Sequence, residues 1–442
     1  MQSPDGDVID CVPFHLQPAF DHPKLRWQGP LDPPERPKGH VPSGDPPEEI
    51  QTWRITGEGC PDGTVAIRRT SKEDIFRANS LRLFGRKPAA IARRNSAGGD
   101  HEHAVGYANG AYYGAKASLS VWAPSVATPA EFSLSQIWVI SGSFGGDLNT
   151  IEAGWQVSPQ LYGDSYPRFF TYWTSDSYQE TGCYNLLCSG FVQTTNKIAI
   201  GAAISPTSVY GRGQFDITLL VWKDPKHGHW WLEFGSGILV GYWPSSLFSH
   251  LAGRAGMVQF GGEIVNTRPG GFHTSTQMGS GRFAGQGFRR AAYFRNLQVV
   301  DWGNSLVPLS NLRVLADHPT CYDVLAVKFT RRSLAVVVAD VPLPLRGLGR
   351  AMRRKRTSSL SILTSKRGPR DYYKGKNCKP TGFHTRKGGY VVQDEKLPRY
   401  VVPDLTDFKL KPYVSQCARD TAAWASKSST TTTTTESSKA AK

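Results

Sequence analysis

The chain has 442 residues, of which 39% are hydrophobic and 11% aromatic, so it is long enough for two or three domains with at least one substantial core. The net charge of +16 is concentrated in residues 346–442, which carry 22 Lys and Arg against 7 Asp and Glu, whereas the preceding residues hold 30 against 29. This composition excludes a single small module. It predicts a nearly neutral body joined to a basic tail that meets a polyanion such as nucleic acid.

Neither a membrane span nor an export signal is expected from the sequence. No stretch approaches the roughly 18 consecutive apolar residues that a membrane helix needs, so no membrane partner is predicted. The start, "MQSPDGDVID", lacks the basic region and apolar core of a signal peptide.

Residues 1–97, the N-terminal segment, read as an accessory part of the chain. Its Pro-rich stretch "GPLDPPERPKGHVPSGDPPEE" predicts an extended, mobile linker. Cys11 and Cys60 flank this linker and could close it into a long loop through a disulfide.

Period-two alternation interrupted by Gly, Pro and Asn runs from about residue 101 to 325. Stretches such as "EFSLSQIWVISGS", "FDITLLVWKD" and "RAAYFRNLQVVD" predict many short strands with hardly a helix between them. The abundant Gly, Pro and aromatic residues agree with this interpretation. The expected fold is mainly β, an antiparallel sandwich or open barrel over residues 98–325.

Two isolated carboxylates stand out in these strands. Glu152 is the only charged residue between Asp147 and Asp164, and Glu263 is the only one between Arg254 and Arg268. Strand alternation places Glu152, Gly154 and Gln156 on one face, and Gln259, Gly261 and Glu263 on one face in the reverse order. Each glutamate is thus matched with a Gln four residues away, across a Gly that leaves room above the sheet.

Two carboxylates that share a site cannot both ionise easily, so one retains a proton. One glutamate can then take a proton from water while its partner donates one to a substrate, with the amides of Gln156 and Gln259 as candidate oxyanion or water-orienting groups. This is hydrolysis without a metal or covalent intermediate. The alternatives are glutamates on a solvated sheet face, and a non-catalytic sandwich that binds carbohydrate through its aromatic residues.

The cysteines and histidines give no sign of a metal site, and no cofactor is expected. Cys183 and Cys188 bracket the short loop "GCYNLLCSG", whose spacing allows a local disulfide, the alternative being two reduced thiols. No second Cys/His pair lies nearby at zinc-ligand spacing.

The basic tail begins after a junction, residues 326–344, and divides into a C-terminal module at 345–417 and a low-complexity end at 418–442 that is expected to be disordered. A run of four cations, Arg353, Arg354, Lys355 and Arg356, is the candidate RNA-phosphate site, with Tyr372, Tyr373 and Tyr390 available to stack on bases. The alternative is a solvated charged tail.

Several long motifs resemble the neprosin family of plant glutamic endopeptidases. They are "GDLNTIEAGWQVSPQLYGDSYPRFFTYWTSDSYQETGCYNLLCSGFVQ" and "GMVQFGGEIVN", with "QPAFDHPKL" and "CPDGTVAIRRT" resembling that family's activation peptide, over residues 8–325 in all. The resemblance implies a secreted β-sandwich with an inhibitory propeptide in contact with it, acid-favoured cleavage of peptides and proteins at proline, and Glu152 and Glu263 as the catalytic pair. Past "HPTCYDV" the chain diverges after Val324, so the sandwich is expected to lack its last edge strand and its activity is in question.

The tail resembles a mitochondrial large-subunit ribosomal protein family, the forty-first in the usual numbering and of the L27 type, over residues 345–415. The quoted motif is "RGLGRAMRRKRTSSLSILTSKRGPRDYYKGKNCKP" and its continuation to "KPYVS". This implies binding to rRNA in the mitochondrial large subunit, a destination that conflicts with secretion. The simplest explanation is a gene-model fusion, in which two neighbouring genes are joined in one predicted open reading frame. The alternatives are a real readthrough product and a ribosomal component with an inactive N-terminal extension.

Overall fold

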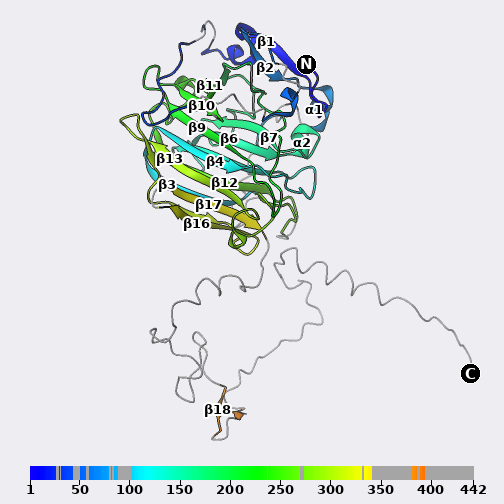
Figure 1. Cartoon of the computed structure of the whole chain (residues 1–442), viewed down its shortest axis with the longest axis vertical. Coiled ribbons are helices and arrows are strands. Elements are labelled where there is room, and N and C mark those ends of the chain that lie inside the picture. The colour runs from blue at the N-terminus through cyan, green and yellow to red at the C-terminus, as the bar shows by residue number, and fades with distance from the viewer. Residues whose placement is uncertain are drawn as a thin grey trace, which may run out of the picture. The chain divides into compact units, whose positions relative to one another are not determined.

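The computed structural model describes residues 1–25, 29, 31–42, 50–55, 59–78, 81, 84–87, 101–235, 237–268, 273–330, 333–340, 381–385 and 389–393. The first 340 residues form a mainly β unit with two large antiparallel sheets (Figure 1). The predicted fold class is confirmed. No helix in the described parts of the chain is long and apolar enough to cross a membrane.

The larger sheet has nine strands in the order β16-β17-β13-β4-β9-β10-β11-β8, with β14 beside β13. Its members are β4 (Gly114–Ser120), β8 (Val192–Gln193), β9 (Asp216–Lys223), β10 (Trp230–Phe234), β11 (Ile238–Trp243), β13 (Ala292–Val300), β14 (Leu306–Pro308), β16 (Tyr322–Thr330) and β17 (Ser333–Asp340).

The smaller sheet has six strands in the order β15-β3-β12-β5-β6-β7 and carries both isolated glutamates. Its members are β3 (His101–Tyr112), β5 (Ser133–Ser141), β6 (Asn149–Val157), β7 (Arg168–Thr174), β12 (Ala255–Val265) and β15 (Arg313–Ala316). The helical elements are short, namely α1 (Lys72–Arg77), α2 (Pro159–Tyr162) and the 3-10 helices η1 (Phe14–Leu16), η2 (Pro18–Asp21), η3 (Thr52–Arg54), η5 (Ser245–Leu247) and η7 (Ala284–Gln286).

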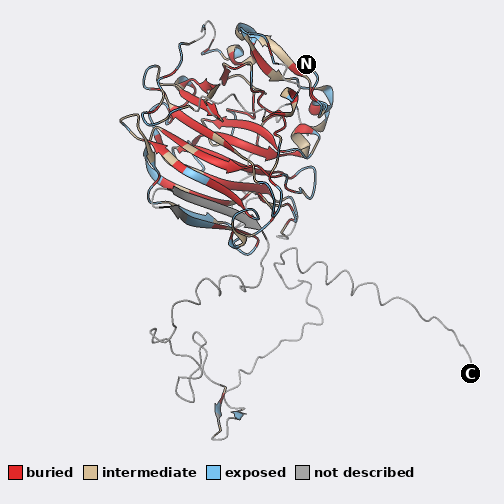
Figure 2. Cartoon of the chain, in the orientation of Figure 1, coloured by how far each residue is buried: buried red, intermediate tan, exposed pale blue. Residues whose placement is uncertain are grey.

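A single apolar core lies between the two sheets (Figure 2). The smaller sheet contributes the face predicted from alternation, since Ile151, Ala153, Trp155 and Val157 are all buried in this core. The glutamate face points the other way, and there Leu134, Trp138, Phe170 and Tyr172 form a second cluster. Burial of large apolar side chains at about 1.5–3 kcal/mol each holds the sheets together.

Strands continue past Val324, contrary to the expected loss of the edge strand. β16 and β17 form an antiparallel pair, and β17 pairs with β13 through Ala292, Tyr293 and Phe294. The run "SLAVVVAD" supplies β17, and its β-branched residues favour an extended backbone. The segment taken as a junction therefore completes this edge of the sheet.

The N-terminal segment packs on the sandwich instead of trailing from it. β1 (Ile9–Pro13) and β2 (Thr64–Arg68) pair with each other, and Ser71 caps the N-terminus of α1 in a capping box. The expectation of a mobile linker is wrong for residues 31–42. Their backbone and side chains bond the larger sheet, with Glu35 N 3.0 Å from Asp224 Oδ1 and Arg36 Nε 2.8 Å from Glu233 Oε2.

Little of the C-terminal module lies within the described residues. β18 (Gly382–His384) and β19 (Tyr390–Val392) pair as a small antiparallel hairpin. Tyr390, one of the proposed stacking residues, is in β19 and is 44% exposed, so its ring is accessible. The cationic run at 353–356, together with Tyr372 and Tyr373, lies outside the described residues.

Candidate active site

The two isolated glutamates come from strands that flank a common neighbour. Glu152 lies on β6 and Glu263 on β12, and β5 runs between these strands. In the register, Glu152 is opposite Trp138 and Glu263 is opposite Leu134. The glutamates are therefore not on adjacent strands, but both project from the same face of one sheet.

Gln136 occupies the position on β5 between the two glutamates. Gly154 of β6 and Gly261 of β12 both pair with it, so no side chain flanks it on either side. A Cβ at Gly154 would lie 2.6 Å from the Gln136 Cβ, which explains why Gly is needed there. The Gln136 amide donates to Glu152 Oε2 at 2.9 Å, while its Oε1 is buried without a hydrogen-bond partner in the described structure.

Both glutamates are buried, with 0% exposure for Glu152 and 2% for Glu263. The solvated-face alternative is therefore wrong. A buried carboxylate needs a counter-charge, and here the N-terminal segment supplies it. Lys87 Nζ donates to Glu152 Oε2 at 2.8 Å and to Glu263 Oε2 at 3.2 Å.

The ammonium of Lys87 sits in a cage of acidic and aromatic groups. Its Nζ lies 5.4 Å from the ring centroid of Tyr172 and 5.5 Å from that of Tyr178, within cation–π range. Burial alone would lower the pKa of Lys87, but attraction to Glu152 and Glu263 outweighs it and raises that pKa. Lys87 is therefore a permanent cation in this form of the chain.

Glu263 has further partners on β3. His101 Nδ1 donates to Glu263 Oε1 at 2.5 Å, and His103 Nε2 lies 4.0 Å from the same oxygen. Burial acts to raise the pKa of Glu263, but Lys87 and His101 together hold it well below its usual range. The predicted shared proton is thus replaced by the Lys87 cation.

Glu152 is oriented by two hydroxyls. Tyr178 OH donates to Glu152 Oε1 at 2.7 Å, and Thr150 Oγ1 donates to the same oxygen at 2.9 Å. Tyr178 is held there by a strained turn, since Ser177 and Tyr178 have φ of 59° and 63°. Asp176 stabilises this turn by accepting backbone N–H groups of residues 179–181.

Gln156 and Gln259, the amides predicted to orient water or bind the oxyanion, have other partners than the two glutamates. Gln156 donates its amide to Tyr162 OH at 3.0 Å, and Gln259 donates to Met257 Sδ at 3.1 Å. Neither amide hydrogen-bonds a glutamate in the described structure, because four residues along a strand correspond to about 13 Å. Gln136 is the amide that occupies the expected place.

The four cysteines singled out from the sequence form two disulfides. Cys11 is joined to Cys60 and Cys183 to Cys188, with Cα–Cα distances of 5.3 and 5.9 Å. The first bridge ties the ends of the N-terminal segment's long loop together. The second holds the loop that carries Tyr184 over the glutamate face.

Sequence reasoning missed Gln136, Lys87, Tyr178 and His101. Gln136 had a usable signal, since "SLSQIWV" places an amide between Leu134 and Trp138 on one strand face. Lys87 had none, because one lysine in "FGRKP" is indistinguishable from a solvated cation. Its role depends on contacts 65 and 176 residues away.

An antiparallel sandwich with two buried, convergent glutamates, plugged by a lysine from the preceding segment, defines a peptidase-like domain in a precursor arrangement. Comparison with protein families gives the same result. Residues 129–335 match the Neprosin family, residues 1–107 match the Neprosin activation peptide, and residues 355–438 match mitochondrial ribosomal protein L27. Both resemblances found in the sequence are confirmed: the N-terminal part is neprosin-like with its activation peptide, and the C-terminal part is L27-like.

Curated relatives of the chain include large ribosomal subunit proteins. Large ribosomal subunit protein mL41A of Xenopus laevis is 56% identical over 52 residues, 12% of this chain and 38% of that protein. Protein mL41 of Rattus norvegicus is 54% identical over 56 residues, which are 13% of this chain and 41% of that protein. The chain thus spans less than half the length of these two relatives.

Solved structures similar to the chain include Scytalido-glutamic peptidase with a peptide-based transition-state analogue, at a TM-score of 0.30 and 14% identity, covering 55% of this chain and 98% of that one. SCP-B, a member of the Eqolisin family of peptidases, has a TM-score of 0.29 and 11% identity, and the match covers 55% of this chain and 98% of that one.

Proposed function

We propose that the sandwich is a proline-directed endopeptidase that hydrolyses peptide bonds with a water nucleophile, using Glu152 and Glu263 as its acid–base pair. The observation that carries this proposal is the convergence of both Oε2 atoms on one point, the Nζ of Lys87, at 2.8 and 3.2 Å. A water at that point would contact both carboxylates. The preference for proline is supported by the Neprosin match alone.

In the proposed reaction, one ionised glutamate takes a proton from this water while the water oxygen bonds the substrate carbonyl carbon. The other glutamate, protonated at acidic pH, gives its proton to the leaving nitrogen as the C–N bond breaks. Gln136, next to Glu152 in the same buried site, is the candidate donor to the oxyanion. Tyr178 holds Glu152 in position.

The N-terminal segment is proposed to inhibit this site. Lys87 occupies the place of the water and forms an ion pair with each carboxylate, so neither can act as acid or base while it is bound. Acid weakens this plug, because protonated glutamates no longer attract the ammonium. Removal of the segment would then expose the pair.

The test uses the full chain, incubated below about pH 4 so that protonation of Glu263 releases the N-terminal segment. Hydrolysis of a fluorogenic proline-containing peptide is then measured at about pH 3–5, where a glutamate pair freed of Lys87 would share a proton. Glu152→Gln and Glu263→Gln should each abolish hydrolysis, while Glu180→Gln, on a neighbouring exposed turn, should not. Hydrolysis that persists in both dyad variants contradicts the proposal. Glycan binding that survives both substitutions, without hydrolysis in the parent, would favour the carbohydrate-binding alternative.

For the C-terminal module, we propose binding to rRNA in the mitochondrial large ribosomal subunit. The L27 match and the mL41 relatives support this role and a mitochondrial location for the module. Replacing Arg353, Arg354, Lys355 and Arg356 with Ala should weaken binding of the full chain to large-subunit rRNA. It should also reduce the slope of log affinity against log salt by up to about 3–4, since each lost phosphate contact removes about 0.7–0.9.

A further inference from the structure

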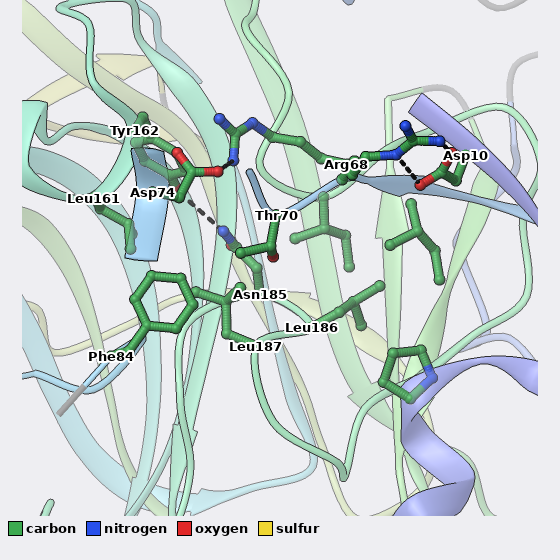
Figure 3. A pocket seen from close by; sticks show the side chains of 14 residues that line it. Asp10, Arg68, Thr70, Asp74, Phe84, Leu161, Tyr162, Asn185, Leu186 and Leu187 are labelled. Carbon is green, nitrogen blue, oxygen red and sulfur yellow. Dashed lines mark hydrogen bonds and ion pairs between the residues drawn. The ribbon is translucent and has the colours of Figure 1, made fainter. Parts of the chain in front are cut away.

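An apolar trough borders the candidate active site on the side from which Lys87 enters. One cavity, of about 150 Å³, is lined by Phe132, Leu161, Tyr184 and Val265 of the sandwich, together with Phe84. A second cavity, of about 190 Å³, shares Phe84 and Leu161 but is lined in part by the charged residues Asp10, Arg68 and Asp74, so the apolar trough is the first cavity alone (Figure 3). Phe84 of the N-terminal segment therefore lies at the boundary of both cavities.

The trough lies beside Glu263, one member of the proposed catalytic pair. Val265 follows Glu263 by two positions on the same face of β12, a separation of about 7 Å. Val265 N donates to the carbonyl of Phe132, and the Phe132 ring contacts His101 edge to face at 5.8 Å. An apolar group seated in the trough would thus lie beside Glu263.

The N-terminal segment crosses this region as a peptide ligand would. Tyr184 N donates to the Gly85 carbonyl at 2.7 Å, and Lys87 N donates to Tyr172 OH at 3.3 Å. Gly85 has φ of +72°, and a Cβ there would lie 2.7 Å from the Leu187 Cβ, so its backbone lies close against the sandwich. The chain runs from Phe84 in the trough to Lys87 at the glutamates.

We propose that the trough is the specificity subsite for a bulky apolar side chain of the substrate, two or three residues on the N-terminal side of the scissile bond. The proposal rests on the proposed peptidase function. Removing the N-terminal segment also removes Phe84, which leaves the apolar side chains of the sandwich uncovered. An apolar side chain of the substrate would cover them again, whereas a carboxylate there would lose its hydration without a partner.

The test measures the acid-activated full chain against proline-containing peptides in which each of four residues before the scissile bond is in turn Phe, Leu, Ala or Asp. We expect kcat/KM to be at least ~10-fold higher for Phe or Leu than for Asp at one position, the second or third before the bond, in line with the selectivity of apolar pockets. Leu161→Asp should abolish this preference. Val209→Asp, which alters an exposed side chain outside the trough, should preserve it.

A binding arm separates this inference from the peptidase proposal. The peptide acetyl-Phe-Gly-Arg-Lys-amide and its Ala-Gly-Arg-Lys counterpart are titrated against the acid-treated full chain and its Leu161→Asp variant. Tighter binding of the Phe peptide to the parent chain only, without hydrolysis of any substrate, would support the subsite and overturn the peptidase function. Hydrolysis with no apolar preference, or with a preference only after the scissile bond, overturns the subsite and leaves the peptidase function standing.

Discussion

Lys87 Nζ donates to Glu152 Oε2 across 2.8 Å, although 65 residues separate the two in the chain. The same ammonium reaches Glu263, so one side chain of the N-terminal segment forms an ion pair with both members of the proposed catalytic pair. The contact explains how two carboxylates can stay ionised in a buried site. The same ion pairs of Lys87 therefore compensate the buried negative charge and, in the proposed function, inhibit the site.

Lys87→Met should remove the positive charge that holds the N-terminal segment at the two glutamates, while keeping a side chain of similar length. Two buried carboxylates would then face each other without a cation, which we expect to lower the free energy of unfolding of the full chain at pH 7 by about 3–5 kcal/mol. Hydrolysis of a proline-containing peptide should also start without an acid-dependent lag. Urea denaturation and progress curves measure the two effects.

Lys226→Met is the control for this variant, because Lys226 is half exposed and, among the described residues, pairs with the exposed carboxylate of Asp32. It should change neither quantity measurably. Unchanged stability and an unchanged lag in Lys87→Met would show that the Lys87 ion pairs do not hold the N-terminal segment in the active site.

The pH dependence of the precursor should follow Glu263. Its pKa is held below the ordinary value despite burial, so the interaction stabilises the folded chain above the unfolded pKa of about 4.3. That contribution is lost as the pH falls through the folded pKa. We therefore expect the N-terminal segment to become protease-sensitive progressively below about pH 4.

Glu263→Gln checks this assignment, because a neutral amide removes the titrating group. The variant should show a shallower fall in the free energy of unfolding between pH 5 and pH 2 than the parent chain. Equal slopes would mean that other carboxylates control release of the segment.

Tyr178→Phe should remove the hydroxyl that orients Glu152 while preserving the ring beside Lys87. A hydrogen bond to a charged group is worth about 1.5–3 kcal/mol, so kcat should fall by roughly 10–150-fold with a smaller change in KM. Tyr166→Phe, which alters an exposed hydroxyl, serves as the matched control. A Tyr178→Phe enzyme with parental kcat would exclude a positioning role.

Gln136→Ala should reduce kcat by about 10²–10³, the range found for loss of one oxyanion donor. Gln259→Ala should have little effect, because the Gln259 amide contacts Met257 instead of a glutamate. Steady-state kinetics on the acid-activated chain compares the two. A larger loss in Gln259→Ala would reverse the assignment made from the structure.

The tryptic peptide "SLAVVVADVPLPLR", residues 333–346, tests whether the peptidase-like and L27-like parts occur in one polypeptide. Its first eight residues form β17, which pairs with β13 of the sandwich. Detection of this peptide by mass spectrometry of native tissue, together with peptides from both sides, would establish one polypeptide, whereas a gene-model fusion predicts that it is absent. Separate recovery of the two parts, in wall and mitochondrial fractions, would indicate two proteins.

Much of the fold could be predicted from period-two alternation. Ile151, Ala153, Trp155 and Val157 are core residues because the side chains of a strand alternate between two faces, which is a local property. Alternation also placed Glu152 and Glu263 on the opposite face. It could not show that β5 separates their strands, because strand order depends on contacts far apart in the sequence.

The sequence by itself determined the strands, the lone glutamates and the division between a neutral body and a basic tail, because composition and periodicity are local. Only the tertiary structure decided that Gln136, and neither Gln156 nor Gln259, lies beside the pair, since this depends on the register of β5 with β6 and β12. It also decided the role of Lys87. A lysine becomes a plug only when folding buries it between two carboxylates, where neither the cation nor the anions can be left unpaired.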